Sequence, residues 1–365
     1  MKYSMTGRIV NELFIKHRKR WAKWRWPVLL VSVILGGCAT LDYYGQSIGG
    51  QWEVLDKRQP IEMLLALPDT PAPMRKKLQA VLDIRDFSIT ELALPDNDSY
   101  RSYADLQRPF VVWNVFATKP FEVSLQTWCF PFAGCVGYRG YFAQEDALAF
   151  AKALAANGQD VYVGGVSAYS TLGWFDDPML NTIIGRSTTR IAGLIFHELA
   201  HQVLYIEGDT AFNEGFATTV QLEGVRRWLA ANGDEQQGRN YGQFLQRQND
   251  FVKLVGDARD RLQQLYTQTM TESDMRTRKA AMTMALRIQY QQLKKHWGGD
   301  EGYDRWFAKD LNNAQLAAVT TYQDYVPGFQ RLLAEQGGDI VAFYQACAAL
   351  GELSLEKRTA ILLRE

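Results

Sequence analysis

The sequence lacks several features that would define a class of protein at once. It has no net formal charge, no internal repeat, and no apolar run of the roughly 20 residues that a membrane-spanning helix needs. Histidine is scarce, with four in 365 residues. The composition is otherwise that of a globular protein, 47% hydrophobic and 22% charged, and the length suits one large domain or two small ones.

The zero net charge conceals an uneven distribution along the chain. Eight lysines and arginines but a single acid, Glu12, precede Cys38. Without that segment the chain carries 32 basic and 39 acidic residues, a net charge of −7. A protein with this charge is a poor nucleic-acid binder, so we expect no nucleic-acid partner.

Residues 1–37 resemble a bacterial lipoprotein signal peptide. A basic region is followed by a short apolar run from Pro27 to Leu35, and the segment ends in Leu35-Gly36-Gly37-Cys38, which is similar to a lipobox. The resemblance implies cleavage before Cys38 and attachment of a lipid to its thiol; the alternative is an uncleaved anchor. Because Ala39 rather than an aspartate follows the cysteine, the resemblance also implies an outer-membrane lipoprotein that faces the periplasm.

Two of the histidines lie in the apolar stretch Ile195-Phe196-His197-Glu198-Leu199-Ala200-His201, a His-Glu-x-x-His motif. Residues four apart share one face of a helix, so His197 and His201 can bind one zinc ion. Glu198 can contact a water on that metal and act as the general base of hydrolysis. The alternative is a chance match on a core helix. However, a histidine pair in an apolar stretch needs polar partners, and a metal ion supplies them.

The segment Asn213-Glu214-Gly215-Phe216-Ala217, whose glutamate lies thirteen residues after His201, resembles the NEGFA segment of zinc aminopeptidases. Together the two motifs are similar to those of the glutamate zincins. In that family this glutamate is the third zinc ligand, so the resemblance assigns the role to Glu214. The gap is several residues shorter than in the large aminopeptidases, and we therefore expect a tighter connection between the two helices.

Physical reasoning favours Glu214 over three other nearby acids. Glu207 precedes Gly208, where a helix typically ends. Asp209 is typical of a helix N-cap, and Glu223 lies nine residues beyond Glu214, on the opposite helix face. The alternative for Glu214 is an acid that the dipole at a helix start stabilises.

Two of the four cysteines, Cys129 and Cys135, are six residues apart. In an exported protein this spacing favours a disulfide that closes a small loop. A metal-binding pair is the alternative, but no second cysteine or histidine pair completes such a site. Cys347 stands among alanines, and we expect a buried thiol there.

Hydrophobic periodicity predicts a mostly helical chain with a few strands. The helix of the His-Glu-x-x-His motif is expected to begin between 186 and 189, with Ser187 or Thr188 as its cap. The other expected helices cover 62–67, 74–82, 144–157, 218–231, 340–350 and 354–363, with a helical hairpin over 235–297 that breaks near 271–274. The expected strands cover 110–116, 121–125 and 161–166, the last extended through 167–173.

Five segments resemble a bacterial family of predicted aminopeptidases: YYGQ, WCFPFAGC, YSTLGWFDDP, HELAHQ and FNEGFAT. We therefore expect an α+β, predominantly helical, zincin-like metallopeptidase with a small sheet beside the His-Glu-x-x-His helix. The peptidase domain is expected to cover 38–365 and to end in a helical part. In zincins a strand before that helix pairs with extended substrate. The strand at 161–166 could play this part, with 170–175 lining the cleft, or it could be a core strand with a glycine bulge.

The resemblance implies a zinc-dependent aminopeptidase that hydrolyses peptide bonds with metal-activated water. Zinc aminopeptidases also carry a downstream tyrosine that stabilises the oxyanion, for which Tyr322 and Tyr325 are candidates; core packing is the other interpretation of both. A periplasmic zinc endopeptidase is the first alternative, because the exopeptidases' GAMEN-type stretch is not visible. A zinc-binding scaffold without turnover is the second, although ligation alone does not need Glu198.

Overall fold

The computed structural model describes residues 43–130, 134–171, 173–319 and 324–364. The chain divides into two units, one that ends at Trp52 and one from Glu53 to Glu365. The described part of the first unit, residues 43–52, is helical. The expected signal peptide, Cys38 and Tyr322 lie outside the described residues. Within the described ranges, no helix is both long and apolar enough to cross a membrane.

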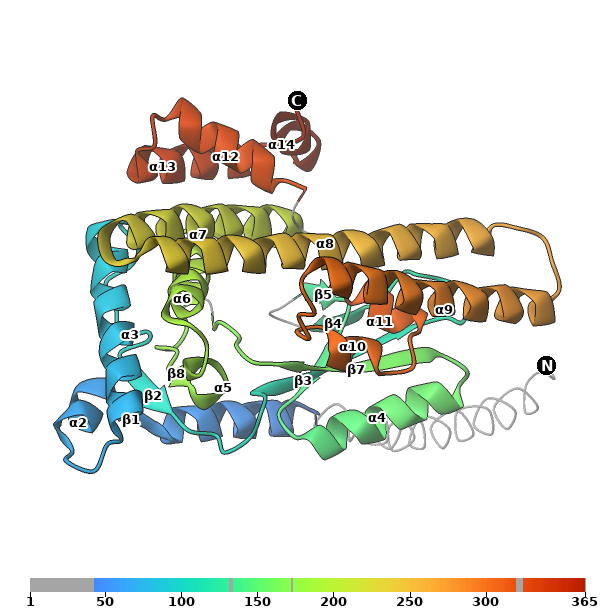
Figure 1. The fold of residues 1–365 in the computed structure, drawn as a ribbon, viewed down its shortest axis with the longest axis horizontal. Helices are drawn as coiled ribbons and strands as arrows, with labels where there is room; N and C mark the ends of the chain where they lie inside the picture. Colours follow the sequence, from blue (N-terminus) through green and yellow to red (C-terminus); the bar gives the residue numbers. More distant parts are fainter. Residues whose placement is uncertain (1–42, 131–133, 172, 320–323, 365) are drawn as a thin grey trace, which may run out of the picture. The chain divides into compact units, whose positions relative to one another are not determined.

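The second unit is predominantly helical, with short strands in three small sheets (Figure 1). In the first sheet, β2 (Ser102–Ala104) lies between β1 (Arg58–Pro60) and β8 (Met179–Leu180), antiparallel to β1 and parallel to β8. In the second, β3 (Val112–Thr118) lies between β6 (Arg139–Tyr141) and β7 (Asp160–Val166), antiparallel to both. The third is a hairpin of β4 (Trp128–Phe130) and β5 (Gly134–Val136).

A disulfide joins Cys129 and Cys135 across the β4–β5 hairpin. The two cysteines lie directly opposite each other in the antiparallel register. Cys347 is a free thiol and is completely buried, as the surrounding alanines indicate.

The helices of this unit surround two hydrophobic cores. The first core contains α3, α6, α7, α12 and α13, and the second lies between α8 and α9 and includes α10 and α11. The helices in chain order are α2 (Ile61–Ala66), α3 (Ala72–Thr90), α4 (Gln144–Ala156), α5 (Asn181–Ile184), α6 (Thr188–Val203), α7 (Thr210–Asn232), α8 (Glu235–Tyr266), α9 (Glu272–His296), α10 (Asp304–Phe307), α11 (Asn313–Ala317), α12 (Val326–Glu335), α13 (Ile340–Gly351) and α14 (Leu355–Leu362).

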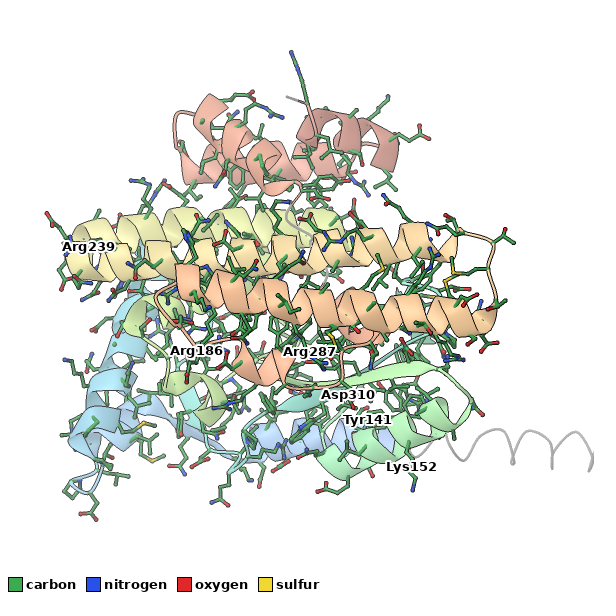
Figure 2. All side chains as sticks on the ribbon, turned by 45° about the vertical axis from the view of Figure 1, so that its right-hand side comes forward. Tyr141, Lys152, Arg186, Arg239, Arg287 and Asp310 are labelled. Atoms are coloured by element: carbon green, nitrogen blue, oxygen red, sulfur yellow. A yellow bond between two sulfur atoms is a disulfide. The ribbon has the colours of Figure 1, made fainter. Side chains whose placement is uncertain are left out.

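The predicted helical hairpin is present as α8 and α9, which run side by side in both views (Figures 1 and 2). The break falls a few residues early, at 267–271, because Thr271 caps α9 by accepting a hydrogen bond from the Asp274 backbone N–H. Figure 2 shows Arg287 of α9 beside Asp310, with 3.9 Å between a guanidinium nitrogen and a carboxylate oxygen.

Two predicted strand segments are not strands. Residues 121–125 form turns and irregular structure, and Phe121 and Val123 pack against the second core from there. Residues 167–171 do not extend β7, because Val166 is already opposite Val112, the first residue of β3. The apolar residues at 121–125 therefore reflect packing against the second core and not strand pairing.

The outer edge of β7 is partly covered by the chain itself. β7 is an edge strand of its sheet, as a substrate-pairing strand would need to be. However, the Asn312 side chain donates to the carbonyl of Val161, and Lys309 donates to that of Val163, both at 3.0 Å. These two carbonyls are therefore not available to an extended substrate.

A glycine allows α6 and α7 to pack closely. A methyl group at Gly224 of α7 would lie 2.6 Å from Cδ2 of Phe196 and 2.8 Å from Cδ1 of Leu92, both of which are fully buried. Overpacking of this kind costs roughly 1–3 kcal/mol of the free energy of unfolding. We expect Gly224→Ala to be destabilised by this amount in denaturant unfolding.

The matched control is Gly242→Ala in α8, where nothing lies within 4 Å of the added methyl. An alanine at an exposed helical position usually stabilises, here by about 0.5–1 kcal/mol. Equal free energies of unfolding for the two variants would contradict the close approach of α6 and α7.

Candidate metal centre

The helix that carries both histidines of the motif, α6, begins as the sequence predicts. Ser187 is its N-cap, and its side chain accepts a hydrogen bond from the Arg190 backbone N–H. One face of the helix is completely buried and consists of Ile191, Ile195, Phe196, Leu199 and Ala200. This face packs mainly against α3, α7 and α8, while β2 and β8 contribute Ala104, Met179 and Leu180 to the same core. The main neighbours of α6 are thus helices and not the expected sheet.

The start of α7 is fixed by two polar side chains. Asp209 is the N-cap and accepts a hydrogen bond of 3.1 Å from the Phe212 backbone N–H, and its other oxygen lies 2.6 Å from Nε of Arg358. The Asn213 side chain bonds both the N–H and the carbonyl of Ile206, at 2.7 and 2.8 Å. This clamp holds the short connection after α6 and gives the asparagine of the Asn-Glu-Gly-Phe-Ala segment a structural role.

His197, His201 and Glu214 converge on one point between α6 and α7. The two imidazole rings are 4.9 Å apart between centroids. Nε2 of His197 lies 3.2 Å from Oε2 of Glu214, and Nε2 of His201 lies 3.6 Å from its Oε1. One donor atom from each residue falls within 4.8 Å of the others, so this group could hold a metal ion.

These distances fit a small tetrahedral ion. Zinc binds imidazole nitrogen and carboxylate oxygen at roughly 2.0–2.2 Å, which places neighbouring ligand atoms of a tetrahedron about 3.3–3.5 Å apart. The two measured nitrogen–oxygen distances, 3.2 and 3.6 Å, lie close to that edge length. Two neutral nitrogens and one carboxylate oxygen are also a ligand set that zinc accepts.

The other three acids near the motif are directed elsewhere. Asp209 caps α7 and pairs with Arg358. Glu223 forms ion pairs with both Arg226 and Arg227 at 2.7 Å, and Glu207 is exposed. Glu214 is the member of this set that faces the histidines, as both the resemblance and the helix geometry indicated.

The charges at this site favour the metal-binding protonation states of His201 and Glu214. Burial alone would lower the pKa of His197, but the Glu214 and Glu198 carboxylates outweigh it and the pKa is raised. Burial, followed by the charge of His197, lowers the pKa of His201 to about 4, so this ring is neutral at pH 7. Burial alone would raise the pKa of Glu214, but the two histidines outweigh it and the pKa is lowered. A neutral imidazole and an ionised carboxylate are the forms that bind a metal.

Glu198 is in a different environment from Glu214. Burial raises its pKa to about 7, and the neighbouring charges of Glu214 and Asp177 add to the rise, while His197 opposes it. In the absence of a metal, the site therefore holds one carboxylate that readily ionises and one that exchanges its proton near neutral pH.

The structure adds Asp177 and Tyr100 to this site, neither of which the sequence pattern had selected. Asp177 is 5% exposed, and burial raises its pKa to about 6. Tyr100 is 2% exposed, and burial followed by the charges of Glu198 and Asp177 raises its pKa well above the usual value. Its backbone N–H donates to the Asp177 carbonyl at 2.6 Å. In the sequence Asp177 belongs to the YSTLGWFDDP segment, to which no chemical role was assigned, and no motif selected Tyr100.

A buried arginine holds the turn that precedes Tyr100. Arg85 of α3 is completely buried and donates hydrogen bonds to the carbonyls of Pro95, Asn97 and Ser99. Gln202, next to His201, accepts a hydrogen bond of 2.7 Å from the Asn97 side chain. The turn is thus attached to α3 on one side and to the ligand helix on the other.

Of the two downstream tyrosines, the structure describes only Tyr325, and its hydroxyl is engaged away from this site. The Tyr325 hydroxyl forms a hydrogen bond of 2.8 Å with the Thr359 hydroxyl in α14, and its Cβ packs near Gly215. Core packing, the other interpretation of Tyr325, accounts for this position.

The fold and the site together define a predominantly helical α+β protein with a candidate metal centre of two histidines and one glutamate. The chain belongs to the family described as "Putative aminopeptidase", which matches residues 42–362. Membership of this family supports a peptidase function. Comparisons with curated proteins and with solved structures find no match for the chain.

Proposed function

We propose that this protein is a zinc-dependent aminopeptidase in which His197, His201 and Glu214 bind the metal. The observation that carries the proposal is the convergence of these three side chains on one point, with the half-buried Glu198 next to His197. The family description supports the peptidase part of the proposal. The donor set and its spacing support zinc over the larger, oxygen-preferring calcium ion.

Zinc, when bound, supplies a Lewis acid that lowers the pKa of water and polarises the scissile carbonyl. Glu198 then takes a proton from the attacking water and later delivers it to the leaving amine. Burial suits Glu198 to this task because a group that exchanges its proton near neutral pH can both accept and donate it. The ionised Glu214 and the neutral His201 need no change of protonation for ligation.

The test combines metal analysis with a matched pair of substrates. Purified protein should contain close to one zinc per chain and should hydrolyse aminoacyl amides with a free amine. Chelation should abolish the activity, and added zinc should restore it. Protein that binds no zinc would overturn the proposal. Cleavage of N-blocked peptides in preference to free ones would indicate the endopeptidase, and bound zinc without turnover would indicate the scaffold.

We further propose that the protein is a lipoprotein of the outer membrane that faces the periplasm. The support is the sequence before Cys38, which resembles a lipobox. Cys38→Ser should release the protein from the membrane fraction or block its maturation, and mass spectrometry of the wild-type N-terminal peptide should find the lipid. Unchanged fractionation of the variant, with no lipid on that peptide, would contradict this localisation.

A further inference from the structure

Each histidine of the candidate metal centre has a buried ring nitrogen that lacks a hydrogen-bond partner among the described residues. This atom is Nδ1 in both rings, whereas Nε2 lies near a Glu214 oxygen, at 3.2 Å for His197 and 3.6 Å for His201. An unpaired buried N–H costs about 1–3 kcal/mol, and a metal-binding histidine almost always donates this N–H to a fixed acceptor. A side chain that can supply such an acceptor is therefore expected beside at least one of the two rings.

Gln221 of α7 lies against α6 next to the His197 ring. It comes seven residues after Glu214, so the two side chains share one face of α7. Its Cγ is 3.4 Å from the position of a Cβ added at Gly193, which lies one helical turn before His197 on α6. Side chains on a helix lean toward its N-terminus, so the His197 ring leans toward Gly193. Burial lowers the pKa of His197, and Gln221 follows the nearby carboxylates among the groups that raise it.

The orientation of the Gln221 amide is set by a third helix. Its Nε2 donates a hydrogen bond of 3.3 Å to the hydroxyl of Tyr241 in α8, a residue that is 8% exposed. The same hydroxyl lies 3.4 Å from the position of a Cβ at Gly193, so this bond is formed directly over α6. Because the amide nitrogen donates to Tyr241, the Oε1 atom of Gln221 is the part of the amide that can accept a proton from His197.

We infer that Gln221 is a positioning residue whose Oε1 accepts the Nδ1–H of His197, with Tyr241 holding the amide in place. The inference rests on the proposed function, which supplies the metal. The bond keeps the proton on Nδ1 and leaves the lone pair of Nε2 for the ion. It also restricts rotation of the ring, so that Nε2 stays beside Glu214. A half-buried glutamine thereby connects the long helix α8 to a metal ligand and acts through His197 alone.

The first experiment measures the zinc affinity of two Gln221 variants by competition with a chelator. Gln221→Met keeps the length of the side chain but removes the acceptor, so its zinc affinity should fall roughly 10- to 100-fold. Gln221→Glu keeps an acceptor, to which the Tyr241 hydroxyl can donate, and should bind zinc nearly as tightly as the wild type. The control is Gln243→Met, the same change at an exposed position of α8, which should leave the affinity unchanged. Equal losses in the two Gln221 variants, or no loss in either, would overturn the inference.

A spectroscopic measurement tests the bond itself, even if Gln221→Met does not fold. In the zinc-loaded wild type with ¹⁵N-labelled histidine, NMR should place the His197 proton on Nδ1 and show that it exchanges slowly with water. In Tyr241→Phe, which lacks the hydroxyl that orients the amide, this proton should exchange at least tenfold faster. A proton on Nε2 in the wild type, or one on Nδ1 that exchanges as freely as that of the exposed His296, would overturn the inference.

Failure of this inference can be told apart from failure of the proposed function. A zinc-dependent peptidase whose zinc affinity is the same in Gln221→Met as in the wild type would refute the role of Gln221 and leave the proposed function intact. Weaker zinc binding by Gln221→Met, in a protein whose wild type hydrolyses no peptide, would support the role of Gln221 and refute the proposed function. A wild type that binds no zinc would overturn both.

Discussion

Glu198→Gln should reduce peptide hydrolysis by a factor of about 10² or more, because general acid–base catalysis contributes typically that much to the rate. Glutamine keeps the shape of the side chain but cannot accept a proton from water. The ligands His197, His201 and Glu214 are unchanged, so the variant should still contain zinc. The measurement is kcat/KM on a free-amine substrate together with the zinc content of the same sample.

Glu207→Gln is the control for this variant, because Glu207 is an exposed acid in the connection just after α6. It should retain both activity and zinc. Near-normal turnover by Glu198→Gln would remove Glu198 from the mechanism, whereas loss of zinc along with activity would assign it a role in holding the metal.

The Glu198→Gln variant should also change how the thermal stability of the metal-free protein depends on pH. The pKa of Glu198 is raised on folding from 4.5 to about 7, so the protonated form is favoured in the folded state. The protonated Glu198 contributes fully to the free energy of unfolding below pH 4.5, and this contribution is lost as the pH rises to about 7. In excess chelator, Glu198→Gln should therefore melt above the wild type at pH 8 and together with it at pH 4.5.

Glu214→Gln should lose most of its affinity for zinc, and its activity with it. The change replaces an anionic oxygen on a dication with a weaker, neutral one. The loss should exceed the roughly 10- to 100-fold that removal of an outer-shell partner costs. A role as a helix-start acid predicts a different result, since such a charge contributes only about 0.3–1 kcal/mol and leaves metal binding intact. Competition with a chelator of known affinity measures the difference.

The control is Glu223→Gln on the same helix. Glu223 pairs with Arg226 and Arg227 and not with the histidines, so this variant should bind zinc normally despite the loss of two ion pairs. If Glu214→Gln retained one zinc per chain under mild chelation while Glu223→Gln or Asp209→Asn lost it, the third ligand would have been assigned to the wrong acid.

Those parts of the site that depend on local geometry could be predicted from the sequence. Spacing on one helix places His197 and His201 together, and the caps Ser187 and Asp209 are recognised from residue type at a helix start. The side of α7 that carries Glu214 follows from the same helical periodicity. These features need no knowledge of distant parts of the chain.

Asp177 and Tyr100 could not be predicted together, because long-range contacts bring them to the site. The parallel pairing of Tyr103 with Met179, which joins β2 to β8, places the two residues side by side. Arg85 then fixes the turn before Tyr100 through carbonyl groups, which leave no trace in the pattern of side chains. Backbone pairing between segments so far apart has no local signature.

The ion pair between Asp209 and Arg358 couples the start of α7 to α14. Asp209 is 6% exposed, and its partner lies 149 residues later in the sequence. Without Arg358 the carboxylate that begins α7 would have no cation, and burying it alone would cost several kcal/mol. Glu214 is five residues from this carboxylate on the same helix. A change in α14, which supplies none of the three candidate ligands, should therefore be felt at the metal centre through the start of α7.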